Sequence, residues 1–273
     1  MTLCALTGST GVIGKRLRKS LPYKFYNFKK DITNYHQVKK WVDKKNFDIV
    51  IHLAAIVPTR VVNKDYLKAK KVNIVGTLNL INALIRKKHK PKWLFFASTS
   101  HVYHMGLKYK KIAEKGKLKP ANKYGKTKKI AENIIKKKLK KSAIKVCIGR
   151  IFSVTDTTQK EPYLIPSLKK KIKNCKNKIL LNDLNHYRDF ITTKNIAAAI
   201  NILYKKKCVG EFNIGSGNKF FLKDIAKLIA KKYKKNVQFK DLHRTTFLIS
   251  NNKKLLRLGW KPKKFKKSLD YFY

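Results

Sequence analysis

Short apolar runs alternate with longer amphipathic segments in the first part of the chain. The apolar runs contain few polar positions, as expected for strands that are covered on both faces of a parallel sheet. Five such strands are predicted, at residues 2–8, 23–28, 47–55, 92–99 and 144–153. The segments between them repeat apolar residues every three or four positions, which is typical of helices. These predicted helices are residues 12–21, 35–45, 72–88 and 126–141.

The alternation of strands and helices determines the fold class that we predict. Helices of this length between consecutive strands imply right-handed βαβ crossovers, and therefore an α/β fold with a doubly wound parallel sheet. After residue 153 the alternation stops, and turn-rich segments follow at residues 155–166, 181–190 and 213–220. We expect this part of the chain to form a smaller C-terminal lobe over the edge of the sheet.

The charge of the chain is strongly positive. Its 273 residues include 67 Lys and Arg against 14 Asp and Glu, which gives a formal net charge of +53. Such a charge favours binding to polyanions. The lysines are spread over nearly every predicted helix and loop, however, and arginine, which reads bases and phosphates in bidentate geometry, is scarce. We therefore expect nucleic acid to bind only non-specifically, at low salt.

Cysteine usage and hydropathy indicate a cytoplasmic protein. The four cysteines, Cys4, Cys147, Cys175 and Cys208, lie far apart and form no Cys-x-x-Cys pair, so neither a zinc site nor a disulfide framework is expected. No metal is predicted elsewhere. No apolar run approaches the roughly 18–20 residues that span a bilayer. The chain enters a strand directly after its N-terminus, without the charged region of a signal peptide.

Three glycines follow the first predicted strand. Gly8, Gly11 and Gly14 are spaced three residues apart in TGSTGVIG and lead into a helix. Glycines at such positions allow a tight turn, close approach of the backbone to a pyrophosphate and close helix packing, while the helix N-terminus supplies free N–H donors. The motif predicts a Rossmann-type sheet that binds a dinucleotide; the alternative is a purely structural turn.

Polar residues that can carry chemistry follow the fourth strand and open the next helix. STSHVY, residues 98–103, places hydroxyls and a histidine at the carboxyl edge of the sheet, where ligands bind in open α/β folds. In YGKTK, Tyr124 and Lys128 lie one helical turn apart, so the ammonium can lower the pKa of the phenol. Lysine is so frequent that the same spacing recurs at three earlier tyrosines, but only Tyr124 lies in the unit that follows STSHVY.

Together these motifs resemble the extended short-chain dehydrogenase/reductase superfamily, in its nucleotide-sugar epimerase, dehydratase and reductase branch. The similarity covers nearly the whole chain. Further segments that carry it are DIT at 31–33, FDIVIHLAA at 47–55, VNIVGTLNL at 72–80, GRIF at 149–152, RDFITTKNIA at 188–197, FNIGSG at 212–217 and LGWKP at 258–262. The resemblance implies an NAD(P)-binding domain over residues 1–153, joined by about 190–212, and a substrate-binding lobe over most of 154–273.

The resemblance also implies the roles of individual residues. Thr99 matches the residue that hydrogen-bonds the reacting sugar oxygen, Tyr124 the general acid or base on that oxygen, and Lys128 the residue that binds the nicotinamide ribose and lowers the tyrosine pKa. The implied cofactor contacts are Gly8, Gly11, Val12, Ile13, Gly14, Asp31, Ile32, Leu53, Ala54, Ala55, Asn73, Tyr124 and Lys128. The implied substrate contacts are Ser100, His101, Ser153 and Arg188, of which Arg188 grips the substrate diphosphate.

Departures from the family pattern narrow the reaction. The 4,6-dehydratases carry an Asp-Glu pair after the threonine, where this chain has Ser100 and His101. Dehydration is therefore disfavoured, and a reductase of a nucleotide-bound 4-keto-(6-deoxy)sugar or a 4-epimerase with tightly bound NAD remains. An inactive nucleotide-sensing or RNA-binding scaffold of the same fold is the alternative of another class, although such proteins usually lose the tyrosine or the lysine.

The choice between NAD and NADP depends on the end of the second strand. No carboxylate there can hold a ribose 2′-hydroxyl, whereas Lys29 and Lys30 would suit a 2′-phosphate, so we favour NADP over NAD by a small margin. A nucleotide-diphosphate sugar is the expected substrate. A homodimer through the long helices of the sheet is a further expectation from the resemblance, and the lack of a spanning apolar run predicts no membrane association.

Overall fold

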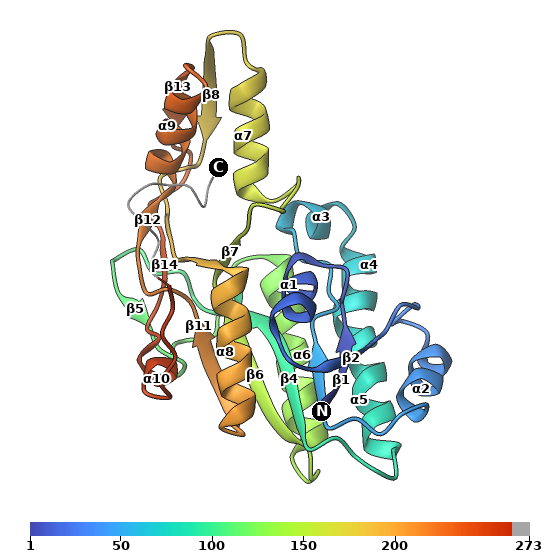
Figure 1. The fold of residues 1–273 in the computed structure, drawn as a ribbon. Helices are drawn as coiled ribbons and strands as arrows, with labels where there is room; N and C mark the ends of the chain where they lie inside the picture. The colour runs from blue at the N-terminus through green and yellow to red at the C-terminus, as the bar shows by residue number, and fades with distance from the viewer. Residues whose placement is uncertain (264–273) are drawn as a thin grey trace.

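The computed structural model describes residues 1–263, which contain a six-stranded parallel sheet in the order β11-β6-β4-β3-β1-β2 (Figure 1). Its strands are β1 (Leu3–Thr7), β2 (Lys24–Asn27), β3 (Ile49–His52), β4 (Trp93–Thr99), β6 (Lys145–Ile151) and β11 (Gly210–Ile214). The predicted α/β class and the doubly wound parallel sheet are confirmed.

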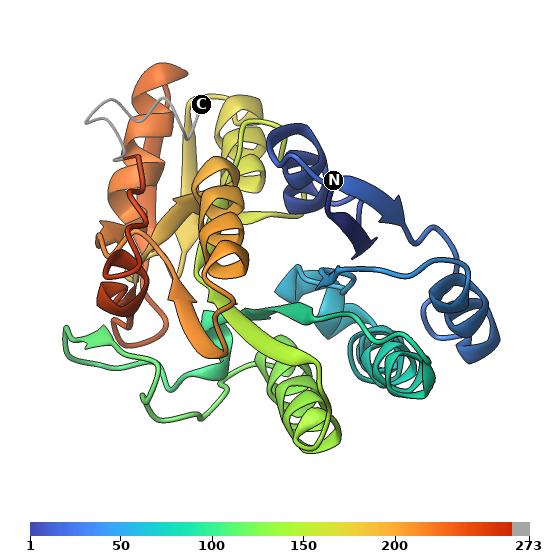
Figure 2. The same ribbon diagram turned by 60° about the horizontal axis from the view of Figure 1, so that its bottom comes forward.

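Helices cover both faces of this sheet (Figure 2). The helices α1 (Val12–Ser20) and α8 (Thr193–Lys205) pack on one face, and α2 (Tyr35–Asp43), α5 (Gly76–Arg86) and α6 (Lys123–Leu139) pack on the other. Successive side chains of a strand point to opposite faces. In β1, Cys4 and Leu6 therefore belong to the core beneath α1 and α8, whereas Ala5 belongs to the core beneath α2 and α5.

The order of the strands creates a binding crevice. From β1 the chain moves outward to β2, and then crosses to the other side of β1 to form β3. The connections that leave the carboxyl ends of β1 and β3 therefore run in opposite directions, and ligands of open α/β sheets bind in the crevice between them. Thr7 and His52 face each other at the end of these two strands.

The helix predicted at residues 72–88 begins differently from the prediction. The short helices α3 (Thr59–Lys64) and α4 (Tyr66–Lys70) come first, and then the π-helical turn η1 (Lys71–Val75) leads into α5. Asn73 lies in this turn, fully buried. Its side chain bonds the backbone N–H and C=O of Ile56 at 2.8 and 3.0 Å, so the turn is tied to the loop that follows β3.

The remaining elements form the second lobe. They are β5 (Lys111–Ile112), β7 (Ser153–Thr155), α7 (Leu164–Asn174), β8 (Lys178–Asn182), β9 (Tyr187–Arg188), β10 (Phe190–Thr192), β12 (Phe220–Phe221), α9 (Leu222–Lys232), β13 (Asn236–Lys240), β14 (Phe247–Ser250) and α10 (Lys253–Leu256). Strands β12, β9, β14 and β5 form a four-stranded sheet. Residues 264–273, the end of the predicted lobe, lie outside the described residues. No helix within residues 1–263 is both long and apolar enough to cross a membrane.

One strand of the main sheet was not among the predicted strands. After the first part of the second lobe, the chain returns through α8 and adds β11 to the edge of the sheet, beside β6. In β11 only Phe212 and Ile214 are large apolar residues, and a turn-rich segment follows directly, so the local pattern resembles a loop. Pairing with β6 and cover from α8 make it a strand.

Candidate active site

A cavity of about 760 Å³ lies at the carboxyl edge of the main sheet and reaches the second lobe. The predicted site residues that line it are Gly8, Gly11, Val12, Ile13, Gly14, Leu53, Ala54, Ala55, Thr99, His101, Tyr124, Lys128, Ser153 and Arg188. Its volume lies within the range of about 300–1,000 Å³ that is usual for ligand pockets. The structure thus brings together residues that are up to 180 positions apart in the sequence.

The glycine loop forms one end of this cavity and requires its glycines. Gly8 has φ of 73°, and a Cβ on it would lie 2.7 Å from the nitrogen of Ala54. A Cβ on Gly14 would lie 2.3 Å from the oxygen of Gly8, so the first turn of α1 rests directly on the loop. Gly11 is the N-cap of α1, and no side chain caps the helix. The free N–H groups of this helix end fit a dinucleotide pyrophosphate.

Thr99 and Tyr124 also line the cavity, and their side chains interact. Thr99 ends β4, and its hydroxyl oxygen accepts the backbone N–H of His101 at 3.3 Å. Tyr124 lies in the first turn of α6 and is 7% exposed. Burial raises the pKa of Tyr124, and an interaction with the Thr99 side chain acts in the opposite direction. The hydroxyl that we predict to exchange a proton is therefore shielded from bulk water and adjacent to Thr99.

Lys128 lies one turn further along α6 and is buried against Phe96. Its Nζ is 4.0 Å from the centre of the Phe96 ring, and the side chain is buried. Burial lowers the pKa of Lys128 to about 7, although Glu132 acts in the opposite direction. We predicted that Lys128 lowers the pKa of Tyr124. In the structure burial outweighs any such effect, because both side chains lie in the same low-dielectric wall.

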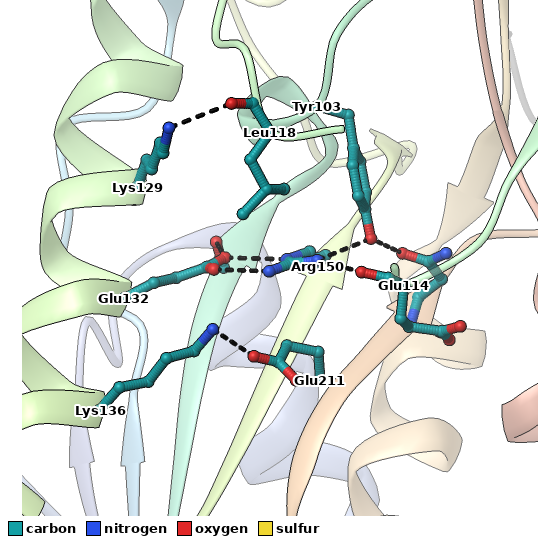
Figure 3. Close-up of polar contacts among 10 residues, drawn as sticks. Tyr103, Glu114, Leu118, Lys129, Glu132, Lys136, Arg150 and Glu211 are labelled. Carbon is teal, nitrogen blue, oxygen red and sulfur yellow. Dashed lines mark hydrogen bonds and ion pairs between the residues drawn. The ribbon is translucent and has the colours of Figure 1, made fainter. Parts of the chain in front are cut away.

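A buried ion pair anchors this part of α6 (Figure 3). Glu132 accepts two hydrogen bonds from Arg150 of β6, from Nε at 3.1 Å and from Nη2 at 2.8 Å, and both side chains are at most 2% exposed. Arg150 also donates to the hydroxyl of Tyr103 at 3.0 Å. Ser98, directly before Thr99, donates to Glu132. The ion pair therefore connects β6 with the helix that carries Tyr124 and Lys128, and the hydrogen bond from Ser98 connects the end of β4 with the same helix.

Arg188 lines the cavity from the second lobe. Its Nη1 donates to the carbonyl oxygens of Tyr187 and Thr246, at 2.8 and 3.1 Å, and its Nη2 donates to the hydroxyl of Thr246 at 3.1 Å. Burial lowers the pKa of Arg188 to about 10, so the guanidinium is charged at neutral pH. Ser153 contributes to the wall nearby, and its backbone N–H donates to the carbonyl of Asp189 at 2.9 Å.

The neighbouring Asp189 holds the loops of the second lobe together. Its carboxylate is fully buried. It accepts the backbone N–H groups of Ser216, Gly217 and Ser250 at 2.8, 2.9 and 3.1 Å, and it also accepts the hydroxyls of Ser216 and Ser250. Burial outweighs these hydrogen bonds and raises the pKa of Asp189. The backbone next to Arg188 is thereby fixed.

Four of the predicted site residues do not line the cavity. Asp31 is exposed and accepts the backbone N–H of Thr33 at 2.9 Å, and this bond lowers its pKa. Ile32 is buried beneath α5, Ser100 is buried in the short 3₁₀ turn η2 (Ser100–Val102), and Asn73 is buried in η1. Asn73 links the loop after β3 to α6, because its side chain bonds the backbone of Ile56 and also donates to the hydroxyl of Thr127 at 3.0 Å. Its polar side chain within an apolar helix is explained by this structural contact.

Other cavity residues were missed by sequence reasoning. Thr10 lies in the glycine loop. Others are contributed by the loop and helix after β3 and by the segment before and within α7, and include Arg60, Gln159, Tyr163 and Lys171. Both segments follow strand ends at the same edge, which was the only available signal. No Asp or Glu lines the cavity among residues 1–263. The polar groups that the cavity presents therefore include hydroxyls, the lysines Lys128 and Lys171, the arginines Arg60 and Arg188, and His101.

The fold, the glycine loop and the placing of Thr99, Tyr124 and Lys128 together define an NAD(P)-dependent enzyme of the extended short-chain dehydrogenase/reductase type. A family model described as GDP-mannose 4,6 dehydratase matches residues 7–270. The chain belongs to this family of nucleotide-sugar epimerases, dehydratases and reductases.

Individual relatives are only moderately similar. The chain is 28% identical over 222 residues to a dTDP-D-glucose 4,6-dehydratase of Dictyostelium discoideum, a match that covers 77% of this chain and 50% of that protein. It is 27% identical over 233 residues to a GDP-6-deoxy-D-talose 4-dehydrogenase of Aggregatibacter actinomycetemcomitans, covering 82% and 78% of the two chains. The chain thus spans half the length of the first of these relatives.

Solved structures share the fold over the whole chain. The structure of RMD from Pseudomonas aeruginosa in complex with NADPH has a TM-score of 0.87 and 21% identity, and the match covers 100% of this chain and 97% of that one. The UDP-glucose 4-epimerase of Thermus thermophilus in complex with NAD has a TM-score of 0.84 and 20% identity, with 99% of each chain covered. Structural neighbours therefore bind NADPH in one case and NAD in the other.

Proposed function

We propose that this protein is a reductase of a nucleotide-bound 4-keto-(6-deoxy)sugar. The observation that carries the proposal is a cavity that holds Thr99, Tyr124 and Lys128 beside a glycine loop and contains no carboxylate among the described residues. By resemblance, a 4,6-dehydratase needs an acid and a base at the positions of Ser100 and His101. Reduction of a ketone needs only a hydride and one proton, and Tyr124 can supply the proton.

The residues of the chain divide the reaction between them. A bound NAD(P)H supplies the hydride, and the glycine loop and the N-terminus of α1 hold its pyrophosphate. The Tyr124 hydroxyl donates its proton to the oxygen of the carbon that is reduced, while the Thr99 hydroxyl hydrogen-bonds the same oxygen. Lys128, on the same face of α6, stabilises in its protonated form the negative charge left on Tyr124 once the proton has gone. Burial of Tyr124 keeps bulk water away from this oxygen.

Substrate contacts come from the second lobe and the end of β4. Arg188 remains charged and lies in the cavity wall, which supports a contact with the substrate diphosphate. Ser153 and His101 line the cavity, His101 against the Tyr124 ring, and are proposed to contact the sugar. Ser100, which is buried in η2, supports the turn through its backbone and is the weakest of the proposed contacts.

We propose NADP(H) as the cofactor. Lys29 and Lys30 are exposed just after β2 and carry charge that suits a 2′-phosphate. Asn27, the last residue of β2, lies beside Leu6, and its side-chain oxygen is buried without a hydrogen-bond partner among residues 1–263. Its amide can turn the nitrogen toward a phosphate or the oxygen toward a ribose hydroxyl. The charges of Lys29 and Lys30 favour the 2′-phosphate, and therefore NADP(H).

The remaining expectations stay predictions. They are a homodimer formed through the long helices of the sheet, a cytoplasmic location, and non-specific adhesion of nucleic acid at low salt that follows from the net charge of +53.

The proposal is tested with purified protein, NADPH or NADH and a panel of nucleotide-activated 4-ketosugars, at a salt concentration that suppresses adhesion. Loss of reduced-nicotinamide absorbance in proportion to substrate, absent in Tyr124→Phe, supports a ketoreductase and reveals the cofactor. No loss of absorbance, with tightly bound NAD and interconversion of nucleotide hexoses in NMR spectra, would instead establish a 4-epimerase. If neither reaction occurs but the cofactor binds, a nucleotide-sensing scaffold is the better description.

A further inference from the structure

His101 is held next to the catalytic tyrosine by three contacts. The backbone of η2 lies so close to α6 that a Cβ on Gly125 would be 2.2 Å from the carbonyl oxygen of His101. The imidazole ring meets the Tyr124 ring edge to face, with 6.0 Å between the ring centres and 66° between the planes. The third contact is a hydrogen bond of 2.8 Å between His101 Nδ1 and the amide nitrogen of Asn122.

The hydrogen bonds of Asn122 determine which ring nitrogen carries the proton. Asn122 is the N-cap of α6, and its Oδ1 accepts the backbone N–H of Gly125 at 2.8 Å. A backbone N–H can only donate, so the oxygen of the amide must face Gly125 and the nitrogen must face His101. The amide nitrogen can also only donate, and Nδ1 is therefore the acceptor. The proton of the neutral ring is then on Nε2.

The surroundings of His101 keep the ring neutral. Burial and the positive charge of Arg188 lower the pKa of His101 to about 4. The ionisable groups that face it are Tyr124 of α6 and Arg188 of β9, and neither supplies a negative charge near neutral pH. Among residues 1–263, no group forms a hydrogen bond with Nε2 of His101. The His101 side chain lines the cavity, so Nε2 is available to a ligand.

We propose that Asn122 locks His101 in its neutral Nε2–H form, so that His101 is a permanent hydrogen-bond donor to the substrate and takes no part in proton transfer. The inference rests on the proposed function for the identity of the substrate. The group that His101 recognises is an oxygen with a free lone pair, such as a hydroxyl, carbonyl or carboxylate oxygen. A protonated amino group in the same place would face a donor and the charge of Arg188, and would be rejected. Asn122 is the positioning residue of this contact.

The state of His101 is measured without any turnover. In protein labelled with ¹⁵N-histidine, long-range ¹H–¹⁵N correlation spectra distinguish the two neutral tautomers from the cation, and the signals of His101 are assigned by their loss in His101→Gln. We expect the Nε2–H tautomer at every pH between about 5.5 and 8, across the range in which an ordinary histidine titrates. The Nδ1–H tautomer in the unaltered protein, or a titration near pH 6.5, would overturn the proposal.

Two matched variants test the role of Asn122. Asn122→Asp keeps an oxygen that caps α6 but turns an acceptor toward Nδ1, so we expect His101 to become Nδ1–H or charged. Asn34→Asp makes the same change at the N-cap of α2, where the Asn34 side chain accepts the N–H of Gln37. Asn34 does not line the cavity. This variant is expected to leave the His101 spectrum unchanged. An unchanged tautomer in Asn122→Asp would refute the lock.

Ligand binding tests the contact with the substrate. GDP-mannose, UDP-glucose and dTDP-glucose are added in turn, with the corresponding sugar-free nucleotide diphosphates as controls. The sugar nucleotide that binds is expected to shift the Nε2 signal of His101. Its affinity is expected to fall roughly 5- to 30-fold in Asn122→Asp when the spectra show the Nδ1–H tautomer, the loss of about one hydrogen bond, and to be retained when they show the cation, which still donates from Nε2. Binding with no shift would remove His101 from the contact. If no sugar nucleotide binds, the proposed function fails, while the spectra still decide whether the lock exists.

Discussion

Replacing Glu132 by glutamine is expected to destabilise the protein far more than a similar substitution one turn away. The carboxylate is 1% exposed and receives two hydrogen bonds from Arg150, which is 2% exposed (Figure 3). Glutamine keeps the size of the side chain but leaves the buried guanidinium without its counter-charge. Removing one partner of a buried ion pair costs about 3–5 kcal/mol in the free energy of unfolding.

The same helix provides the control. Lys136 pairs with Glu211 across the edge of the sheet, but the two side chains are 42% and 29% exposed. Exposed pairs contribute about 0.2–1 kcal/mol, so Lys136→Gln should cost no more than that. Urea unfolding followed by tryptophan fluorescence gives the free energy of unfolding of both variants.

Equal losses in the two variants would refute the reasoning, because burial is what separates the pairs. The double variant Glu132→Leu/Arg150→Met adds a second check. It removes both charges at once, and buried pairs replaced by apolar residues of similar size are often no less stable than the original. We therefore expect the double variant to be more stable than Glu132→Gln, although Tyr103 and the carbonyl of Glu114 lose a donor in it.

Three further predictions concern the cavity. Tyr124→Phe should lower kcat by about 10²- to 10⁴-fold while NADPH still binds, as measured by nicotinamide absorbance and fluorescence; full activity would exclude Tyr124 as the proton donor. Gly14→Ala should abolish NADPH binding in a fluorescence titration, because its Cβ would collide with Gly8; unchanged affinity would contradict the close packing of the loop. Lys128 has a pKa of about 7 in the folded protein against 10.5 as the ordinary value. The unfolded chain then binds the extra proton between these values, so this residue makes stability rise with pH there. Lys128→Met should be more stable than the unaltered protein at low pH, with an advantage that shrinks from pH 7 upward; an advantage independent of pH in thermal melts would contradict the low pKa.

The sequence predicted the parts of the site that depend on strand ends and short motifs. Gly8, Thr99 and Tyr124 follow strands or open a helix at one edge of a parallel sheet, and any such sheet brings those positions together. Asn73 and Asp31 could not be placed in this way. Their side chains are used by contacts with Ile56 and Thr33 that depend on how loops fold back, which no periodicity records.

The second lobe was predicted least well, for a physical reason. Its strands are two to five residues long, and β5 comes from the first half of the chain while its partner β14 comes from the end. Segments this short have no clear hydrophobic period of their own, and their conformation is set by pairing with distant segments. Tyr163 and Gln159 reach the cavity from this part of the chain, and their approach was therefore not visible in the sequence.

The contacts of Asp189 make one wall of the site depend on segments that are synthesised late. Its carboxylate binds Ser216, Gly217 and Ser250, and Arg188 binds Thr246, so the wall beside Arg188 needs chain that leaves the ribosome some 60 residues later. The first four strands to enter the main sheet, and with them the glycine loop, are available by residue 99. The nascent chain thus contains the glycine loop long before it contains the segments that fix Arg188. A chain truncated before residue 246 would lack the hydrogen bonds that Arg188 makes to Thr246 and that Asp189 accepts from Ser250.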